Sequence, residues 1–259
     1  MRLRTSGSEN SFLQSFLRET GGLAIFSGAF FARWWRAPRE WKALFDQMDE
    51  AGTRSFMLTA ITGFAIGVVL AMQSRASLER FGAEAAMPSM LALSIFKELG
   101  PLLTSLVLAG RLGAGISAEL GSMRVTEQID ALEVGALKPF NYLVVTRVLA
   151  CIIVFPILTI WTDLIALSGG YLESVLSENM DYRLFIGTAF SNLSLSDVIV
   201  NTMKTSIFGF IVGMVSCYLG YNVRGGTREV GQAAMRAVVV SSLLIFLSNV
   251  IIVRMTLLL

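Results

Sequence analysis

The segment SIFKELGPLLTSLVLAGRLGAGISAELGSMR, Ser94 to Arg124, decides the fold class of this chain. Most of it is apolar enough for a membrane-spanning helix, yet it contains Lys97, Glu98, Arg111 and Glu119. An ionised group in hydrocarbon is costly unless it is paired or hydrated. The segment therefore predicts a membrane helix whose charged residues have partners or face water.

The composition of the whole chain also indicates a membrane protein. Of its 259 residues, 54% are hydrophobic and 15% are charged, whereas a soluble domain carries about 25% charged residues. Histidine is absent, which removes the commonest metal ligand and the usual general base. Cys151 and Cys217 lie inside apolar runs, so we expect small buried thiols rather than a disulfide or a metal site.

Five segments are long and apolar enough to cross a bilayer, which takes about 20 residues. Residues 21–45 form a shorter apolar run, interrupted by Arg33 and Arg36 and rich in Trp. This pattern is typical of a helix in the membrane interface, and an extra re-entrant span is the alternative. We expect an all-α integral membrane protein with an interfacial amino-terminal region, 1–54, and a five-span domain, 55–259. The predicted spans are 55–74, 87–122, 143–170, 198–221 and 237–259.

The basic residues predict the orientation of these spans. Residues 1–54 contain eight Lys and Arg, and further basic residues occur in 222–236 and after the second span. Five crossings place these regions on one side, which the positive-inside rule makes cytoplasmic. The loop 171–197 on the other side holds four acidic residues against Arg183 alone. We therefore expect a cytoplasmic amino terminus and a carboxyl terminus on the outer side.

The second predicted span has two weak points. Pro101 has no N–H, so the carbonyl of Lys97 loses its helical partner, and residues 110–115, GRLGAG, are rich in glycine. We expect the helix to bend or break at these points, because the segment is too long for one straight crossing. Two GxxxG pairs are expected to allow close helix contacts: Gly63 with Gly67, and Gly209 with Gly213.

Polar residues on three predicted helices lie at similar depths in the outer half of the membrane. They are Glu98 in the second span, Lys204 in the fourth, and Asn249 and Arg254 in the fifth. One interpretation is a structural ion pair, and the other is a wet or amphipathic cavity open to the outer side. Arg111 and Glu119 lie nearer the cytoplasmic end, where we expect them to serve packing and helix anchoring.

The connection between the second and third spans contains a short amphipathic helix. We expect Thr126 to cap it, Gly135 to end it, and Ile129, Leu132 and Val134 to supply apolar contacts. Such a helix on the cytoplasmic face is suited to docking a partner. The chain has no GxxxxGK[ST] phosphate loop, so nucleotide hydrolysis would need another polypeptide. With no zinc-protease motif and no serine–histidine arrangement, we do not expect an enzyme.

The segment FKELGPLLTSLVLAGRLGAGISAELGSMRVTEQIDALEVGALKP, residues 96–139, resembles the signature region of MlaE-type permeases. These are the membrane subunits of lipid-transporting ABC systems associated with MCE proteins. The KELGP, AGR.GAG.SAELG.M and TEQIDAL runs occur in the family's order and spacing. The resemblance implies an MlaE-like permease fold and a homodimer in the bacterial inner membrane, with the carboxyl terminus in the periplasm.

The resemblance also implies partners and a ligand. The partners would be a cytoplasmic MlaF-like ABC ATPase that binds ATP and magnesium, a periplasmic MlaD-like MCE hexamer and, in some systems, an MlaB-like STAS-domain protein. No cofactor, metal or nucleic acid is expected on this chain. Bound phospholipid would occupy a periplasm-facing cavity between two permease subunits.

The resemblance assigns two groups of residues. Positions of the family cavity match Leu70, Lys97, Glu98 and Leu99, with Lys204 as a further intramembrane charge, and Asn249 stands where the family often has an acidic residue. The coupling helix to the ATPase would be 127–137, with the contact residues Glu127, Gln128, Asp130, Leu132 and Glu133.

The implied function is a permease subunit of an ATP-driven ABC transporter that moves phospholipids between the inner and outer membranes. One alternative is an ion-coupled transporter or proton channel that uses Glu98 and Lys204. A third interpretation is a membrane scaffold whose charges only hold helices together.

Overall fold

The computed structural model describes residues 7–34, 41–135, 138–178, 180–256 and 258. Five helices in this part of the chain are long and apolar enough to cross a membrane. The expected all-α membrane fold is therefore confirmed. The five candidate spans are Trp41–Glu79, Glu84–Val125, Phe140–Ser177, Leu195–Tyr221 and Thr227–Thr256.

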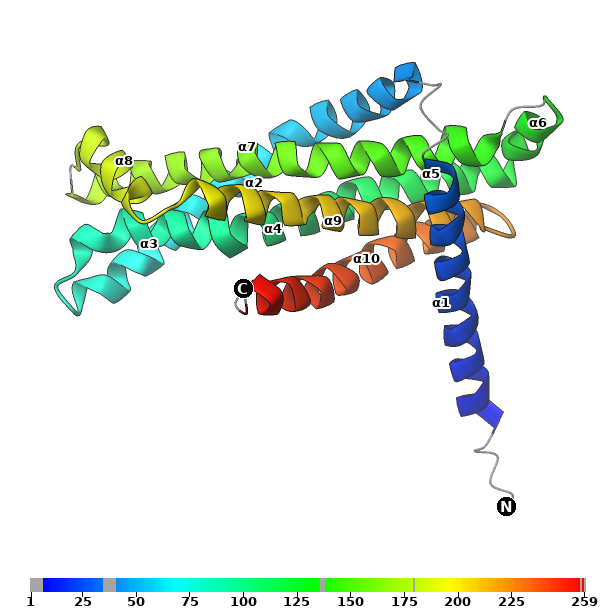
Figure 1. The fold of residues 1–259 in the computed structure, drawn as a ribbon, viewed down its shortest axis with the longest axis horizontal. Coiled ribbons are helices and arrows are strands. Elements are labelled where there is room, and N and C mark those ends of the chain that lie inside the picture. Colours follow the sequence, from blue (N-terminus) through cyan, green and yellow to red (C-terminus); the bar gives the residue numbers. More distant parts are fainter. Residues whose placement is uncertain (1–6, 35–40, 136–137, 179, 257, 259) are drawn as a thin grey trace.

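The amino-terminal region, 1–54, contains helix α1, Gly7–Trp34, and about the first third of helix α2, Trp41–Glu79. The run 21–45, predicted as one interfacial helix, therefore belongs to two helices, and residues 35–40 lie outside the described residues. Helix α1 stands at a steep angle to the long helices, as Figure 1 shows. Its Phe26 ring lies 5.0 Å from that of Phe140 and 5.5 Å from that of Tyr218.

The second span is one continuous helical segment with two π turns. Each π turn lies at a predicted weak point, and at the first one the N–H of Gly100 donates to the carbonyl of Ile95. The wider turn absorbs the proline without a break, because the backbone there bonds five residues back instead of four. The elements are α3 (Met87–Ser94), a π turn (Ile95–Leu99), α4 (Gly100–Leu108), a second π turn (Ala109–Gly113) and α5 (Ala114–Val125).

The remaining helices follow the predicted order with longer bounds. The short helix α6, Gln128–Val134, precedes α7, Thr146–Glu178, which a π turn at Phe140–Val145 introduces. Helix α8, Tyr182–Ser191, was not expected; the Asp181 side chain caps it by accepting from the Arg183 N–H. Helices α9, Leu195–Tyr221, and α10, Thr227–Thr256, complete the bundle.

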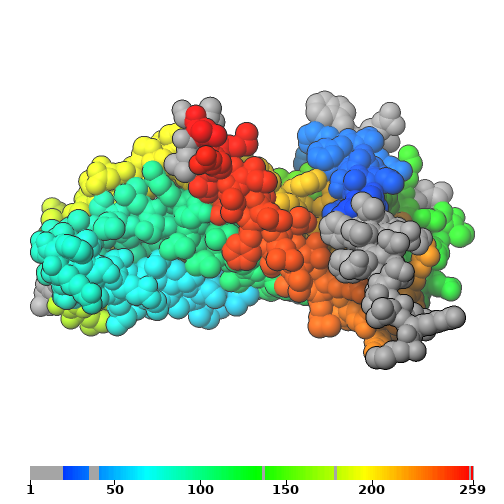
Figure 2. All heavy atoms as spheres, turned by 90° about the horizontal axis from the view of Figure 1, so that it is seen from below, coloured from blue at the N-terminus to red at the C-terminus, as the bar shows by residue number. Residues whose placement is uncertain are grey.

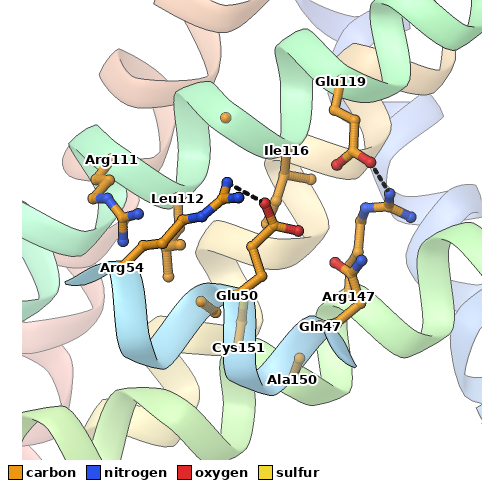
Figure 3. Close-up of a pocket in the computed structure, with 12 residues that line it drawn as sticks. Gln47, Glu50, Arg54, Arg111, Leu112, Ile116, Glu119, Arg147, Ala150 and Cys151 are labelled. Atoms are coloured by element: carbon orange, nitrogen blue, oxygen red, sulfur yellow. Dashed lines mark hydrogen bonds and ion pairs between the residues drawn. The ribbon is translucent and has the colours of Figure 1, made fainter. Parts of the chain in front are cut away.

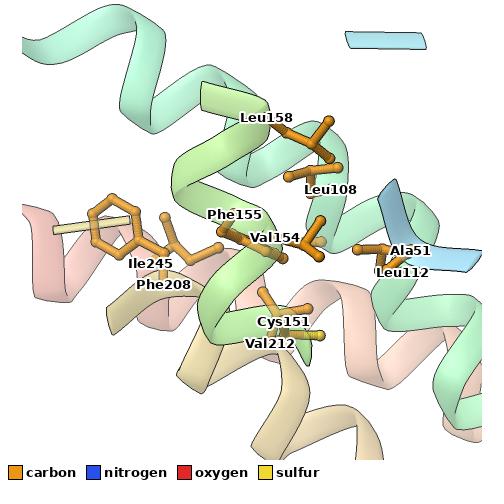
Figure 4. Packing of buried hydrophobic residues seen from close by; sticks show 11 residues of the cluster. Ala51, Leu108, Leu112, Cys151, Val154, Phe155, Leu158, Phe208, Val212 and Ile245 are labelled. Carbon is orange, nitrogen blue, oxygen red and sulfur yellow. The ribbon is translucent and has the colours of Figure 1, made fainter. Parts of the chain in front are cut away.

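Helix α7 lies at the centre of the bundle, and both GxxxG pairs pack against it. A Cβ added at Gly67 would overlap the carbonyl of Ala166, and one at Gly209 would lie 2.5 Å from that of Cys151. Buried apolar side chains, including Leu108, Phe155 and Phe208, fill the space around α7 (Figure 4). As expected, Cys151 and Cys217 are buried free thiols.

Helix α10 lies on the outside of the bundle, as Figure 2 shows for one face. Only 17% of its most apolar stretch is buried, against 67% of the corresponding stretch in the third span. The exposed side chains include Leu243, Leu247, Val250 and Ile251. Within the part of the chain that the structure describes, a large apolar surface next to the polar cluster described below is thus left uncovered.

Candidate functional site: a polar cluster on the second span

The carboxylate of Glu98 connects the three helices whose polar residues were predicted to lie at similar depths in the membrane. Its Oε2 accepts a hydrogen bond from Lys204 Nζ on α9 at 3.1 Å. Its Oε1 accepts one from Asn249 Nδ2 on α10. The structure therefore brings Glu98, Lys204 and Asn249 into direct contact, whereas the sequence indicated only a shared depth.

The π turn gives Lys204 its second partner. Pro101 cannot donate to the carbonyl of Lys97, and Lys204 Nζ donates to that oxygen at 2.8 Å. Lys204 is only 4% exposed, and a buried ammonium is tolerated when acceptors surround it. The carbonyl freed by the proline is thus one of the two acceptors that allow a lysine inside the bundle.

The cluster is open on one side. The Lys97 ammonium lies 3.1 Å from Asp197 Oδ2, and both side chains are partly exposed. The Glu98 side chain is 39% exposed. Leu99, on the same π turn, is half-buried, as is Leu70 of α2, which packs against the apolar cluster around Leu91. The arrangement offers both signs of charge next to apolar side chains.

Asp163 of α7 is a residue that the sequence analysis missed. It is 1% exposed, and its Oδ1 has no hydrogen-bond partner among the described residues. A Cβ added at Gly100 would overlap this oxygen, so the carboxylate lies against the start of α4. The available signal was a single carboxylate in the apolar run IIVFPILTIWTDLIALSGG, which by itself marks a functional or structural polar site.

The predicted short amphipathic helix appears as α6; of the stretch 127–137, residues 136–137 lie outside the described residues. The prediction that Thr126 caps it is wrong, because the Thr126 hydroxyl donates back to the carbonyl of Ser122 within α5. Glu127 stands at the cap position instead, in the left-handed conformation with φ 59°. Gly135 follows the last helical residue, as expected, and its N–H donates to the carbonyl of Ala131.

The packing of α6 differs from the prediction at one position. Ile129 is fully buried and Leu132 is half-buried, but Val134 is 90% exposed because the helix presses on the bundle through its other face. Arg124 Nη1 anchors the helix by donating to Asp130 Oδ1 at 2.5 Å. Several of the predicted contact residues are exposed and so accessible to a partner: Glu127, Gln128, Asp130 and Glu133.

Comparison with known proteins places this architecture in a family. The family model described as Permease MlaE matches residues 44–255. A probable ABC transporter permease protein of Rickettsia felis is 38% identical over 98% of this chain and 98% of its own length. A similarly named protein of Synechocystis is 37% identical over 79% of this chain and 78% of its own.

A plant relative extends the range of similar proteins. The Arabidopsis thaliana protein named trigalactosyldiacylglycerol 1, chloroplastic, is 30% identical over 87% of this chain and 64% of its own length. The family match covers all five candidate spans except the first residues of α2 and the last of α10. The chain therefore belongs to the MlaE permease family and is a multi-pass membrane permease subunit of the ABC transporter type.

Proposed function

We propose that this permease subunit moves phospholipids between the inner and outer membranes of a bacterium, with the polar cluster around Glu98 lining the lipid cavity. The observation that carries the proposal is a partly exposed set of charges inside an apolar bundle. A phospholipid matches both features, because its head group can bind Lys97 and Glu98 while its acyl chains contact Leu70 and Leu99. The name of the plant relative is that of a galactolipid, which shares its diacylglycerol part with phospholipids and so favours a lipid with two acyl chains as the cargo.

ATP hydrolysis would come from a cytoplasmic MlaF-like ATPase docked on α6. The helix is fixed to the bundle by Ile129 and by the Arg124–Asp130 pair, yet it presents Val134 and acidic side chains outward. A helix that is fixed to the bundle and exposes both apolar and acidic side chains can transmit a movement of a bound partner to the second span. The Lys and Arg residues near α6 and in the amino-terminal region support a cytoplasmic position for this end of the bundle and a periplasmic carboxyl terminus. On the periplasmic side, an MlaD-like MCE hexamer would receive or deliver lipid.

The cavity would form between two copies of the chain. Charged side chains as exposed as those of Lys97 and Glu98 are unfavourable in contact with hydrocarbon. The neighbouring α10 is the least buried of the five candidate spans. A second copy packed beside α10 would cover these groups and enclose lipid. An MlaB-like STAS-domain protein would complete the assembly on the ATPase side.

The test is ATP-dependent transfer of a fluorescent phospholipid by the assembled complex in proteoliposomes. Glu98→Ala should abolish most of the transfer, and Leu70→Trp should obstruct the cavity with all charges present. Both complexes should still assemble with the ATPase. Glu79→Ala, a change at an exposed carboxylate at the end of α2, is the matched control. Normal transfer by both Glu98→Ala and Leu70→Trp would refute the cavity assignment.

The buried carboxylate of Asp163 supports a second candidate, an ion-coupled transporter or proton channel. Its unpartnered oxygen lies next to the segment that carries Glu98, where protons could pass between carboxylates. This candidate predicts proton flux into liposomes that contain the permease alone, without an ATPase, and loss of that flux in Asp163→Asn. Absence of flux from the wild-type permease would exclude it.

A further inference from the structure

A polar cavity lies away from the Glu98 cluster, toward the α6 end of the bundle. It has a volume of about 300 Å³ and is bounded by α2, α5, the second π turn and α7. Figure 3 shows Arg54, Arg111 and Arg147 around it, together with Glu50 and Glu119. Three guanidinium groups from three separate parts of the sequence thus converge on one space.

The charges of the cavity do not balance. Arg54 Nη1 lies 2.5 Å from Glu50 Oε1, and Arg147 Nη2 lies 2.6 Å from Glu119 Oε1. Arg111 has no carboxylate within ion-pair distance in the described part of the chain; its hydrogen-bond partner is the hydroxyl of Ser55. One positive charge is therefore left for a ligand.

Arg147 supplies an independent sign of a missing ligand. The residue is 4% exposed, and its Nη1 donates to the carbonyl of Leu143 at 3.0 Å. Its Nε is buried and has no hydrogen-bond partner among the residues that the structure describes. Buried donors in folded proteins are almost always paired, so an acceptor from outside the chain is expected at this cavity.

The positions of Arg54 and Arg147 along their helices indicate the kind of ligand. Arg54 directly precedes the apolar stretch of α2, and Arg147 directly precedes that of α7. Basic residues at the ends of apolar stretches lie at the level of lipid head groups. Leu112 and Ile116 line the cavity alongside the charges, which suits a ligand with both an anionic and an apolar part.

We propose that this cavity binds the phosphate group of an anionic phospholipid from the leaflet at the α6 end. Guanidinium groups bind phosphate oxygens through short, charge-assisted hydrogen bonds. Arg111 makes the direct contact, and Arg147 Nε offers a further donor. The site is distinct from the transport cavity, because Arg111 follows Glu98 by more than three helical turns on the same span. Inorganic phosphate shares the binding chemistry but lacks the part that would contact Leu112 and Ile116.

The test is native mass spectrometry of the full-length protein released from nanodiscs that contain equal amounts of phosphatidylglycerol and phosphatidylethanolamine. Arg111→Gln should reduce retained phosphatidylglycerol about tenfold, the size of effect that loss of one charge-assisted hydrogen bond produces. Gly115→Leu should do the same with every charge in place. Nothing lies within 4 Å of a Cβ added at Gly115, so the new side chain fits and fills the cavity.

Arg228→Gln is the matched control, since it removes one positive charge at an exposed position near the start of α10, outside the cavity. It should leave phosphatidylglycerol retention unchanged. Unchanged retention in Arg111→Gln and Gly115→Leu, or an equal loss in Arg228→Gln, would overturn the proposal. Displacement of the lipid by excess inorganic phosphate would assign the site to the free anion instead. Glu98→Ala, measured in parallel, should keep this lipid, so failure of the transport proposal would not affect the result.

Discussion

Lys204 connects two helices through a single ammonium group. Its Nζ donates to the Lys97 carbonyl at 2.8 Å and to Glu98 Oε2 at 3.1 Å. Lys204→Met would leave the carbonyl without a donor and Glu98 with Asn249 alone. We expect the free energy of unfolding to fall by about 1–3 kcal/mol, measured by thermal unfolding in detergent.

Lys97→Met is the matched control for this prediction. The Lys97 ammonium pairs with Asp197, and both groups are partly exposed. Such pairs contribute about 0–1 kcal/mol. An equal loss of stability in the two variants would mean that burial does not distinguish the two lysines.

At this scale the sequence predicted the acceptor but not its donor. Pro101 indicates that the Lys97 carbonyl is free, since that follows from backbone chemistry alone. The donor that occupies it comes from a lysine more than 100 positions later, and its choice depends on how α9 packs against the second span. Asp163 was missed for the same reason: it has no partner at a recognisable spacing, and its surroundings arise from packing with Gly100.

The close contact between α2 and α7 depends on Gly67. A Cβ at this position would overlap the backbone carbonyl of Ala166, which cannot move without shifting α7. Gly67→Ala should therefore destabilise the protein by roughly 1–3 kcal/mol, as overpacking of a core does. Gly52→Ala on the same helix meets nothing within 4 Å and should stabilise by about 0.5–1 kcal/mol. Unfolding midpoints of the two variants should move in opposite directions; a stable Gly67→Ala would contradict the packing.

The exposed tip of α6 allows a test of the coupling assignment. Val134→Asp changes a side chain that is 90% exposed, so the bundle should remain as stable as the wild type. It should reduce co-purification of the ATPase at least tenfold, because a charge would enter the interface. Leu176→Asp, at an exposed apolar position on the opposite end of α7, is the control. Equal ATPase recovery in both variants would remove α6 from the interface.

The helices of the structure are longer than the spans predicted from the sequence, for a physical reason. Hydropathy marks only the part of a helix that meets hydrocarbon, whereas the hydrogen-bonded ladder continues wherever no residue stops it. Residues 41–54 contain no proline, and α2 runs through them without interruption. The two weak points of the second span were located correctly, but the residue types there did not indicate that each takes the form of a π turn.

At the scale of the whole molecule, the main exposed apolar surface considered for assembly is that of α10. The partly exposed Lys97 and Glu98 lie beside a helix whose apolar face is largely exposed among the described residues. Two copies related by a twofold axis would bring the same surface of each chain together. Residues near the axis would then meet their own equivalents.

Single cysteines on α10 test this arrangement. Cysteines at Leu243, Leu247, Val250 and Ile251 can be introduced one at a time, because the native Cys151 and Cys217 are fully buried and unreactive. At least one of the four should form a disulfide between two copies in membranes, since disulfides require Cα atoms within about 7 Å. A cysteine at the exposed Leu164 of α7 should not. Cross-linking at Leu164 with none on α10 would place the second copy on another face and leave the Glu98 cluster without a cover.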